Sequence, residues 1–148
     1  MVNALIEEML FSGKPFLFTV TTDSMVPFLR PYDEITVRRI PLTSLKCGDI
    51  VVFKRCSDIY CHRLLRKRVF GSQVRLITKG DSSSGIDNPV DDKDFLGKAV
   101  RIHKLGKIVN LENPFWTVVN FFIGLLSYFE GVVYSSLCKI KRYILRFG

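Results

Sequence analysis

The sequence predicts a mainly β domain, built as a barrel or a folded sandwich, with a short N-terminal helix and a C-terminal hydrophobic helical tail. Seven short runs are rich in β-branched and aromatic residues, and several alternate apolar and polar positions as half-buried strands do. Glycines separate these runs where turns require a permissive backbone. The chain length of 148 residues allows one compact domain and an appendage.

The predicted elements follow in order along the chain. Residues 3–12 form a short amphipathic helix, because Asn3 is a suitable N-cap and Gly13 and Pro15 end the helical pattern. The seven strands are expected at 16–20, 35–37, 49–54, 59–65, 74–78, 99–103 and 107–111. Residues 82–94 (SSSGIDNPVDDKD) are predicted to form one polar loop, too long for a simple hairpin turn.

The end of the chain differs from the rest in charge. Residues 113–148 contain five charged residues, whereas residues 1–112 hold 18 basic and 13 acidic residues. We therefore divide the chain into a domain of residues 1–112 and a tail of residues 113–148. The run from Phe115 to Cys138 has one charge, Glu130, and as a helix it extends roughly 36 Å, enough for a hydrocarbon core of about 30 Å.

Three arrangements of this tail are open: a membrane span, a helix on the membrane surface, and a helix packed on the β domain. Glu130 and Asn120 argue against a span, because polar groups are costly in lipid. The tail ends in four basic residues, which suit either a positive-inside flank or a surface helix: Lys139, Lys141, Arg142 and Arg146. The predicted partner is membrane lipid, contacted through residues 115–146.

Charge and cysteine usage exclude other classes of function. The net charge of +8 favours anionic partners, but the one dense basic cluster (Arg63, Arg66, Lys67 and Arg68) lacks a recognisable nucleic-acid module, so no nucleic acid is expected. The four cysteines, Cys47, Cys56, Cys61 and Cys138, have no metal-ligand spacing, so no metal is expected. Cys56 and Cys61 either face each other across a hairpin or stay reduced.

Three polar islands interrupt the apolar pattern and are candidates for chemistry. Ser24 follows the first predicted strand, and a serine there can act as a nucleophile if a base and an oxyanion hole are supplied. His62 lies inside an apolar strand, and Asp81 and Asp87 follow the fifth strand. Taken singly, such residues are more common as turn, cap or buried structural residues.

The order and spacing of five boxes make the islands more specific together. The boxes are Ser24-Met25-x-Pro27-x-Leu29, then GDIVVF at 48–53, then His62-Arg63-Leu64-Leu65, then Thr78-Lys79-Gly80-Asp81, then Leu96-Gly97-Lys98-Ala99-Val100. Over about residues 15–105 this series resembles the signal peptidase I family of serine peptidases. The resemblance implies a coiled, two-sheet β fold and hydrolysis of a peptide bond without a cofactor.

The resemblance also indicates the base and the acid. Bacterial members use a lysine in the third box, whereas endoplasmic-reticulum and archaeal members use a histidine, so His62 places this chain with the histidine type. Lys67 is a rival base, because the stretch Lys67-Arg68-Val69-Phe70-Gly71 also resembles the lysine form of the third box. A neutral imidazole accepts a serine proton near neutral pH without heavy burial. Asp87 matches the family's orienting carboxylate, with Asp81 as a supporting or alternative acid.

The implied oxyanion hole is the backbone N–H of Ser24 together with the hydroxyl of Thr22, which takes the place of the family's serine. Three features depart from the family pattern. Asp23 replaces a glycine beside the nucleophile, and Tyr32 stands before Asp33 where a glycine is usual. The third is the position of the hydrophobic segment, which is C-terminal here and N-terminal in typical members.

The expected function is a serine endopeptidase that removes a signal or leader peptide from a precursor, bound as an extended segment. The alternative is a catalytically inactive member that binds peptides or docks on membranes, and self-cleavage in the manner of SOS repressors is a weaker third. The N-terminus has glutamates where a secretory signal has positive charge, so no cleavable signal is predicted. The active site of this membrane-associated chain is therefore expected on the cytoplasmic side.

Overall fold

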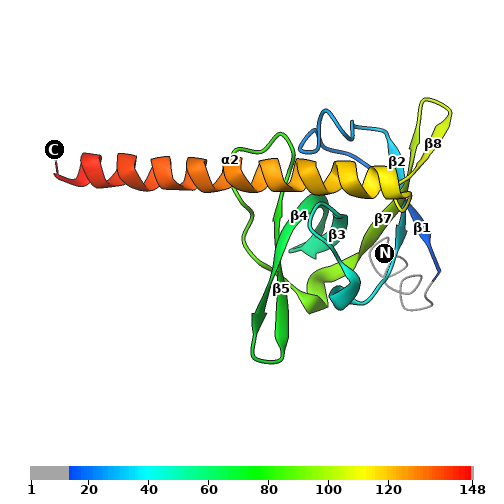
Figure 1. Ribbon diagram of the computed structural model, residues 1–148, viewed down its shortest axis with the longest axis horizontal. Coiled ribbons are helices and arrows are strands. Elements are labelled where there is room, and N and C mark those ends of the chain that lie inside the picture. Colours follow the sequence, from blue (N-terminus) through cyan, green and yellow to red (C-terminus); the bar gives the residue numbers. More distant parts are fainter. Residues whose placement is uncertain (1–13, 148) are drawn as a thin grey trace.

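The computed structural model describes residues 14–147, and the environment of side chains as far as Lys139. An antiparallel sheet is crossed by one long helix, α2, on one face (Figure 1). The strands are β1 (Phe16–Thr19), β2 (Glu34–Arg38), β3 (Ile50–Arg55), β4 (Asp58–Phe70), β5 (Gln73–Lys79), β6 (Val90–Asp91), β7 (Phe95–Lys104) and β8 (Lys107–Asn110). Two 3-10 turns, η1 (Leu42–Ser44) and η2 (Asp92–Asp94), and α2 (Pro114–Phe147) complete the elements. The predicted mainly β class is confirmed.

The strands form one hydrogen-bonded path in the order β1-β2-β7-β3-β4-β5-β6, and β8 pairs with β7. Register shifts in the pairs of β2, β3 and β4 mark bulges, which bend strands and increase their twist. The sheet encloses two clusters of buried side chains, and β3 contributes to both. Ile50 and Val52 belong to one cluster and Val51 and Phe53 to the other, because successive side chains of a strand point to opposite faces.

Four predicted elements differ from the structure or fall outside it. The strand expected at 99–103 begins at Phe95 and continues to Lys104 as β7. The strand expected at 59–65 continues to Phe70, where β4 forms a long hairpin with β5. The loop expected over residues 82–94 ends in the short strand β6 and the turn η2. The helix predicted at 3–12 lies outside the described residues.

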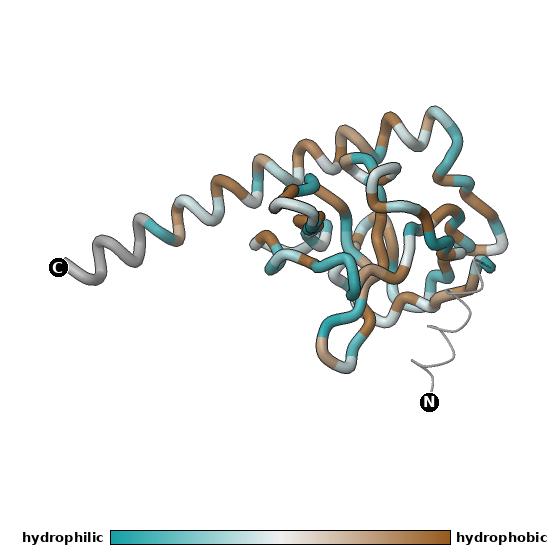
Figure 2. Tube along the Cα trace, turned by 90° about the horizontal axis from the view of Figure 1, so that it is seen from below, coloured by the Kyte–Doolittle hydropathy of each residue, from teal (hydrophilic) through white to brown (hydrophobic). Residues whose placement is uncertain are grey.

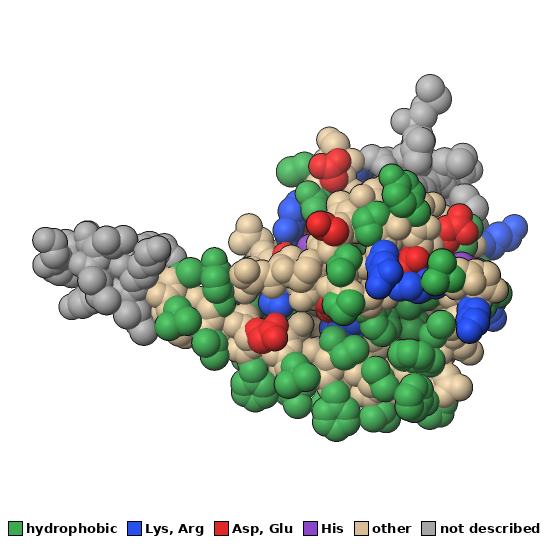
Figure 3. Space-filling model, turned by 90° about the horizontal axis from the view of Figure 1, so that it is seen from above, with side chains coloured by type: hydrophobic (Ala, Val, Ile, Leu, Met, Phe, Trp, Pro, Cys, Tyr) green, Lys and Arg blue, Asp and Glu red, His purple; other side chains and the backbone are tan. Residues whose placement is uncertain are grey.

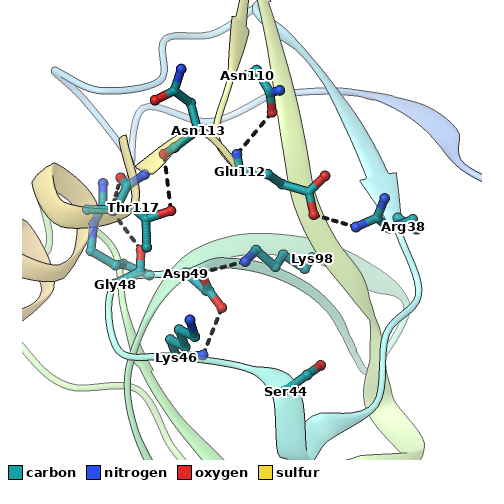
Figure 4. Close-up of polar contacts among 12 residues, drawn as sticks. Arg38, Ser44, Lys46, Gly48, Asp49, Lys98, Asn110, Glu112, Asn113 and Thr117 are labelled. Atoms are coloured by element: carbon teal, nitrogen blue, oxygen red, sulfur yellow. Dashed lines mark hydrogen bonds and ion pairs between the residues drawn. The ribbon is translucent and has the colours of Figure 1, made fainter. Parts of the chain in front are cut away.

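Helix α2 begins immediately after Asn113, which caps it. The side chain of Asn113 accepts a hydrogen bond from the backbone N–H of Phe115 at 3.0 Å, and its carbonyl accepts from the N–H of Thr117 at 2.9 Å (Figure 4). The first half of α2 lies on the β domain, and the second half extends beyond it (Figures 1 and 2).

The helix approaches the domain so closely that backbones touch. A Cβ on Gly124 would lie 2.8 Å from the Cα of Gly48, and a Cβ on Gly48 would lie 2.1 Å from the carbonyl oxygen of Asn120. Gly48 also has φ of 91°, a conformation that favours glycine. Helix α2 therefore packs directly on the turn before β3, where the two glycines leave no side chain between the backbones.

Candidate active site

Ser24 lies on the loop between β1 and β2, and core residues anchor this loop on both sides of it. Met25 and Leu29 are buried in the larger core cluster, so the loop cannot move as a free turn. The backbone N–H of Ser82 donates to the carbonyl of Ser24 at 3.0 Å, and the Ser82 hydroxyl donates to the carbonyl of Asp23 at 2.8 Å. The loop after β5 thus supports the backbone at Ser24.

Gly80 permits this close contact between the two loops. A Cβ at position 80 would lie 2.6 Å from the carbonyl oxygen of Ser24 and 3.2 Å from its Cβ. Contacts under 3 Å to backbone require the backbone to shift, so no larger residue fits here without displacing Ser24. The glycine of the fourth sequence box therefore has a steric role next to the candidate nucleophile.

Ser24, His62 and Asp87 form a continuous chain of hydrogen bonds. The Ser24 Oγ lies 3.1 Å from Nε2 of His62, and Nδ1 of His62 lies 2.6 Å from Oδ2 of Asp87. With the carboxylate accepting from Nδ1–H, Nε2 is left as the acceptor for the serine proton. This geometry allows the imidazole to act as a general base toward the hydroxyl and the carboxylate to orient the ring.

Packing and a further hydrogen bond hold the imidazole and the carboxylate in place. His62 is in β4, pairs with Val51 of β3, and is 6% exposed. Its ring makes edge contacts with Phe53 and Tyr60, at centroid distances of 5.9 and 6.0 Å. The hydroxyl of Thr78 donates to Oδ2 of Asp87 at 2.7 Å, so that oxygen is positioned from β5 as well as by the histidine.

Thr22 and Asp23 lie directly before the candidate nucleophile. The Thr22 hydroxyl is 3.1 Å from the Ser24 Oγ, so the side chain expected to line the oxyanion hole lies within reach of the reacting oxygen. Asp23 is exposed, and its carbonyl is held by Ser82.

Asp81 contacts a different partner from the one that Asp87 contacts. Both of its carboxylate oxygens accept from the guanidinium of Arg63, at 2.8 and 2.7 Å, whereas the imidazole of His62 bonds Asp87. Arg63 is fully buried, and its Nη1 also donates to the carbonyl of Gly48 and to Oδ1 of Asn120, at 2.9 and 2.7 Å. Asp81 therefore belongs to a buried network that joins the fourth box, the second box and α2.

Lys67, the rival base, lies near His62 in the sequence but is hydrogen-bonded elsewhere. The Lys67 ammonium donates to the carbonyls of Leu42 and Thr43 in η1 and does not contact Ser24. Burial raises the pKa of the Cys61 thiol to about 12, which keeps it neutral and unreactive. All four cysteines are free thiols, so Cys56 and Cys61 do not form a disulfide.

The second and fifth boxes also meet in space (Figure 4). Asp49, directly after Gly48, accepts from the ammonium of Lys98 on β7 at 2.8 Å and from the backbone N–H of Lys46 at 2.8 Å. This pair fixes the turn on which α2 is seated. Among the residues that the structure describes, no group of three His, Cys, Asp or Glu side chains is arranged to hold a metal ion.

A groove runs between the Ser24 loop and α2. It has a volume of about 390 Å³ and is lined mainly by apolar side chains: Pro27, Phe28, Asp81, Ile123, Leu126, Ser127 and Glu130. Phe28 forms part of its wall and packs against Trp116 with ring centroids 6.0 Å apart. The first half of α2 is therefore one side of the surface next to the candidate nucleophile.

Sequence reasoning missed two residues of this site. Ser82 supports the nucleophile backbone, and nothing distinguishes it from the other serines of a polar loop. Asn120 contacts Arg63 from α2, and its signal was a polar side chain within an apolar run. Glu130, the charge within that run, lies 3.5 Å from the buried ammonium of Lys79.

Comparisons with known proteins agree with this architecture. Residues 4–100 match the peptidase S24-like family. The signal peptidase complex catalytic subunit SEC11 of Colletotrichum graminicola is 34% identical over 98 residues, which cover 63% of this chain and 55% of that protein. The chain thus spans about half the length of this relative. The match to the family and the mainly β fold show that the chain belongs to the peptidase S24-like family, as a signal peptidase I-like member.

Proposed function

We propose that the protein is a serine endopeptidase in which Ser24 is the nucleophile, His62 the general base and Asp87 the orienting acid. The observation that carries this proposal is the unbroken hydrogen-bond chain from the Ser24 Oγ through the His62 imidazole to the Asp87 carboxylate. Membership of a peptidase family supports the reaction class.

The proposed reaction follows the acyl-enzyme route. The Ser24 Oγ attacks the scissile carbonyl while Nε2 of His62 takes its proton, and Asp87 stabilises the imidazolium. The backbone N–H of Ser24 donates to the oxyanion. The Thr22 hydroxyl also donates to it, after the Thr22 side chain rotates about χ1. His62 then protonates the leaving amine, and water attacks the acyl-enzyme with the imidazole again acting as base. The chain's own groups carry every proton, so this mechanism requires no cofactor.

The proposed substrate is a precursor protein from which a signal or leader peptide is removed. The likeness to a signal peptidase catalytic subunit supports this substrate class. The scissile segment would bind extended, by adding a strand beside the sheet, and cleavage would follow a small side chain. Residues 115–146 would keep the enzyme at the membrane where such precursors are located.

A serine-reactive covalent probe tests the mechanism directly. We expect Ser24→Ala to abolish labelling, and His62→Ala and Asp87→Asn to slow labelling and peptide cleavage by about 10³-fold or more, as in other triads. Lys67→Ala is the matched control and should retain the parent rate, because Lys67 is bonded to η1. A Lys67→Ala variant as inactive as His62→Ala would contradict the choice of base.

The rival proposal is a catalytically silent member that binds peptides or docks on membranes. Asp23 motivates it, because a carboxylate beside a developing oxyanion is unfavourable. The same probe separates the two proposals. An unlabelled parent protein that still binds an extended peptide favours the silent form, whereas labelling that disappears in Ser24→Ala excludes it.

A further inference from the structure

Helix α2 has two faces of opposite character. Its buried residues are small or polar and face the β domain: Asn120, Gly124, Ser127 and Gly131. The opposite face is apolar and exposed, with exposed fractions of 66% at Phe115, 57% at Phe122, 65% at Leu126, 59% at Phe129 and 59% at Leu137. Figure 3 shows these hydrophobic side chains gathered along the outer edge of α2.

This arrangement is the reverse of a surface helix in a globular protein, which turns its apolar stripe toward the core. The α2 face that needs a nonpolar environment points away from the β domain, so its cover must come from outside the described chain. By length and composition, Pro114–Lys139 is a helix that lipid could accommodate. Lipid could cover it either across the bilayer or along the bilayer surface.

The packing of α2 on the β domain argues against a helix that crosses the bilayer. A hydrocarbon core takes about 20 helical residues, and any such window within Pro114–Lys139 includes residues 120–133. This segment contacts the domain at three places: Asn120 bonds Arg63, Gly124 touches Gly48, and Gly131 lies against Ile86. A span with this packing would carry the contacting part of the β domain to the same depth.

The part of the domain that would enter lipid is charged and irregular. The polar loop after β5 meets α2 where Ile86 lies against Gly131, and its Ser82 and Ser84 are exposed. The carboxylate of Glu130 on α2 is exposed as well. Loops with exposed backbone groups and charged side chains are not stable against hydrocarbon. A helix parallel to the surface needs no such burial, since only its outer face enters the lipid.

We propose that α2 lies in the plane of an anionic bilayer surface, with its outer face in the lipid and the β domain on the aqueous side. The chain carries a net charge of +8, and after Glu130 its sequence has four basic residues and no acidic residue, which suits anionic headgroups. The groove between Phe28 and Leu126 then opens beside the lipid. The Ser24 loop, whose Pro27 and Phe28 line this groove, then lies close to the membrane surface.

Depth-dependent fluorescence quenching in vesicles tests this orientation. The chain has one tryptophan, so Trp116→Phe in the full-length protein gives a background without tryptophan. Single tryptophans are then placed along the outer face by Phe115→Trp, Phe122→Trp, Phe129→Trp and Leu137→Trp. The vesicles contain phosphatidylcholine and phosphatidylglycerol with bromine at different depths of the acyl chain. Leu17→Trp, on the exposed side of β1, is the control away from α2.

An in-plane helix gives the four outer-face tryptophans one common shallow depth, and the control is not quenched. A profile that is deepest at positions 122 and 129 and shallow at 115 and 137 would show a span and overturn the proposal. Absence of quenching at all four positions would also overturn it, because the outer face would then not contact lipid. The readout does not depend on proteolysis, so its failure is distinguishable from failure of the proposed function.

Discussion

Tyr32 adopts a left-handed backbone conformation, with φ of 72°, at the turn that leads from the Ser24 loop into β2. Its N–H donates to the carbonyl of Val20 at 2.8 Å, and its side chain is 87% exposed. A residue with a Cβ pays about 1–2 kcal/mol in this region, whereas glycine does not. A glycine also increases the conformational entropy of the unfolded chain, which offsets part of this gain in stability. We expect Tyr32→Gly to raise the free energy of unfolding by about 0.5–1 kcal/mol, measured by urea denaturation.

Tyr32→Ala is the matched control for this prediction. It removes the same exposed ring but keeps a Cβ, so the unfavourable backbone conformation remains. We expect no gain in stability from this variant. Equal stabilisation by alanine and glycine would show that loss of the ring, and not the backbone conformation, is responsible.

The sequence predicted the candidate site residues only when they were considered together. Ser24 and His62 are 38 positions apart, and His62 and Asp87 are 25 apart, so no local pattern links them. The order of the five boxes, two of which contain Ser24 and His62, suggested a family resemblance, and that resemblance added Asp87. The preference for Asp87 over Asp81 came from the family resemblance, because both are loop aspartates and nothing else in the sequence distinguishes them. Their different partners follow from tertiary structure, in which Arg63 and not His62 faces Asp81.

At the scale of elements, α2 is joined to the domain by a buried hydrogen bond from Arg63 to Asn120 at 2.7 Å. Removing the acceptor leaves one donor of a fully buried guanidinium without this partner. Loss of such a bond to a charged group costs about 1.5–3 kcal/mol. We expect Asn120→Ala to lower the free energy of unfolding by that amount, measured by urea denaturation in mild detergent.

Leu126→Ala provides the comparison on the same helix. Leu126 is larger than Asn120 but 65% exposed on the outer face, so its truncation should change stability by less than about 0.5 kcal/mol in the same detergent. Equal losses of unfolding free energy in the two variants would mean that the bond to Arg63 does not stabilise the packing of α2 on the domain.

Element patterns explain which parts of the fold were predictable. A continuous apolar run predicted β3, whose side chains fill both core clusters and are therefore buried on both faces of the strand. The far half of β4 carries Arg66, Lys67 and Arg68, which are solvent-exposed, so it has no apolar period to predict it. The orientation of α2 was unpredictable for a related reason. Its domain-facing residues are small or polar, and the apolar pattern marks the face that the domain does not cover.

At the scale of the whole molecule, contacts of α2 with the β domain cross the boundary at residue 112 that the charge distribution suggests. Trp116 packs on Phe28 of the Ser24 loop. The guanidinium of Arg63 lies over the same ring, with its carbon 4.8 Å from the ring centroid. Gly131 lies against Ile86, the residue before Asp87. We therefore propose that the first half of α2 is part of the peptidase unit, and that only the residues beyond it form a separable tail.

Two truncations test this division. A chain ending at Glu112 loses the contacts to Phe28, Arg63 and Gly48, so the Ser24 loop should open more often, and its amides should exchange with deuterium about tenfold faster or more. A chain ending at Lys139 keeps every contact that the structure describes between α2 and the domain, so exchange in the loop should stay within about twofold of the full chain. Mass spectrometry of peptides covering residues 21–32 measures both rates. Unchanged exchange in the chain ending at Glu112 would mean that the β domain holds the nucleophile loop without α2, and that the charge boundary is also the structural one.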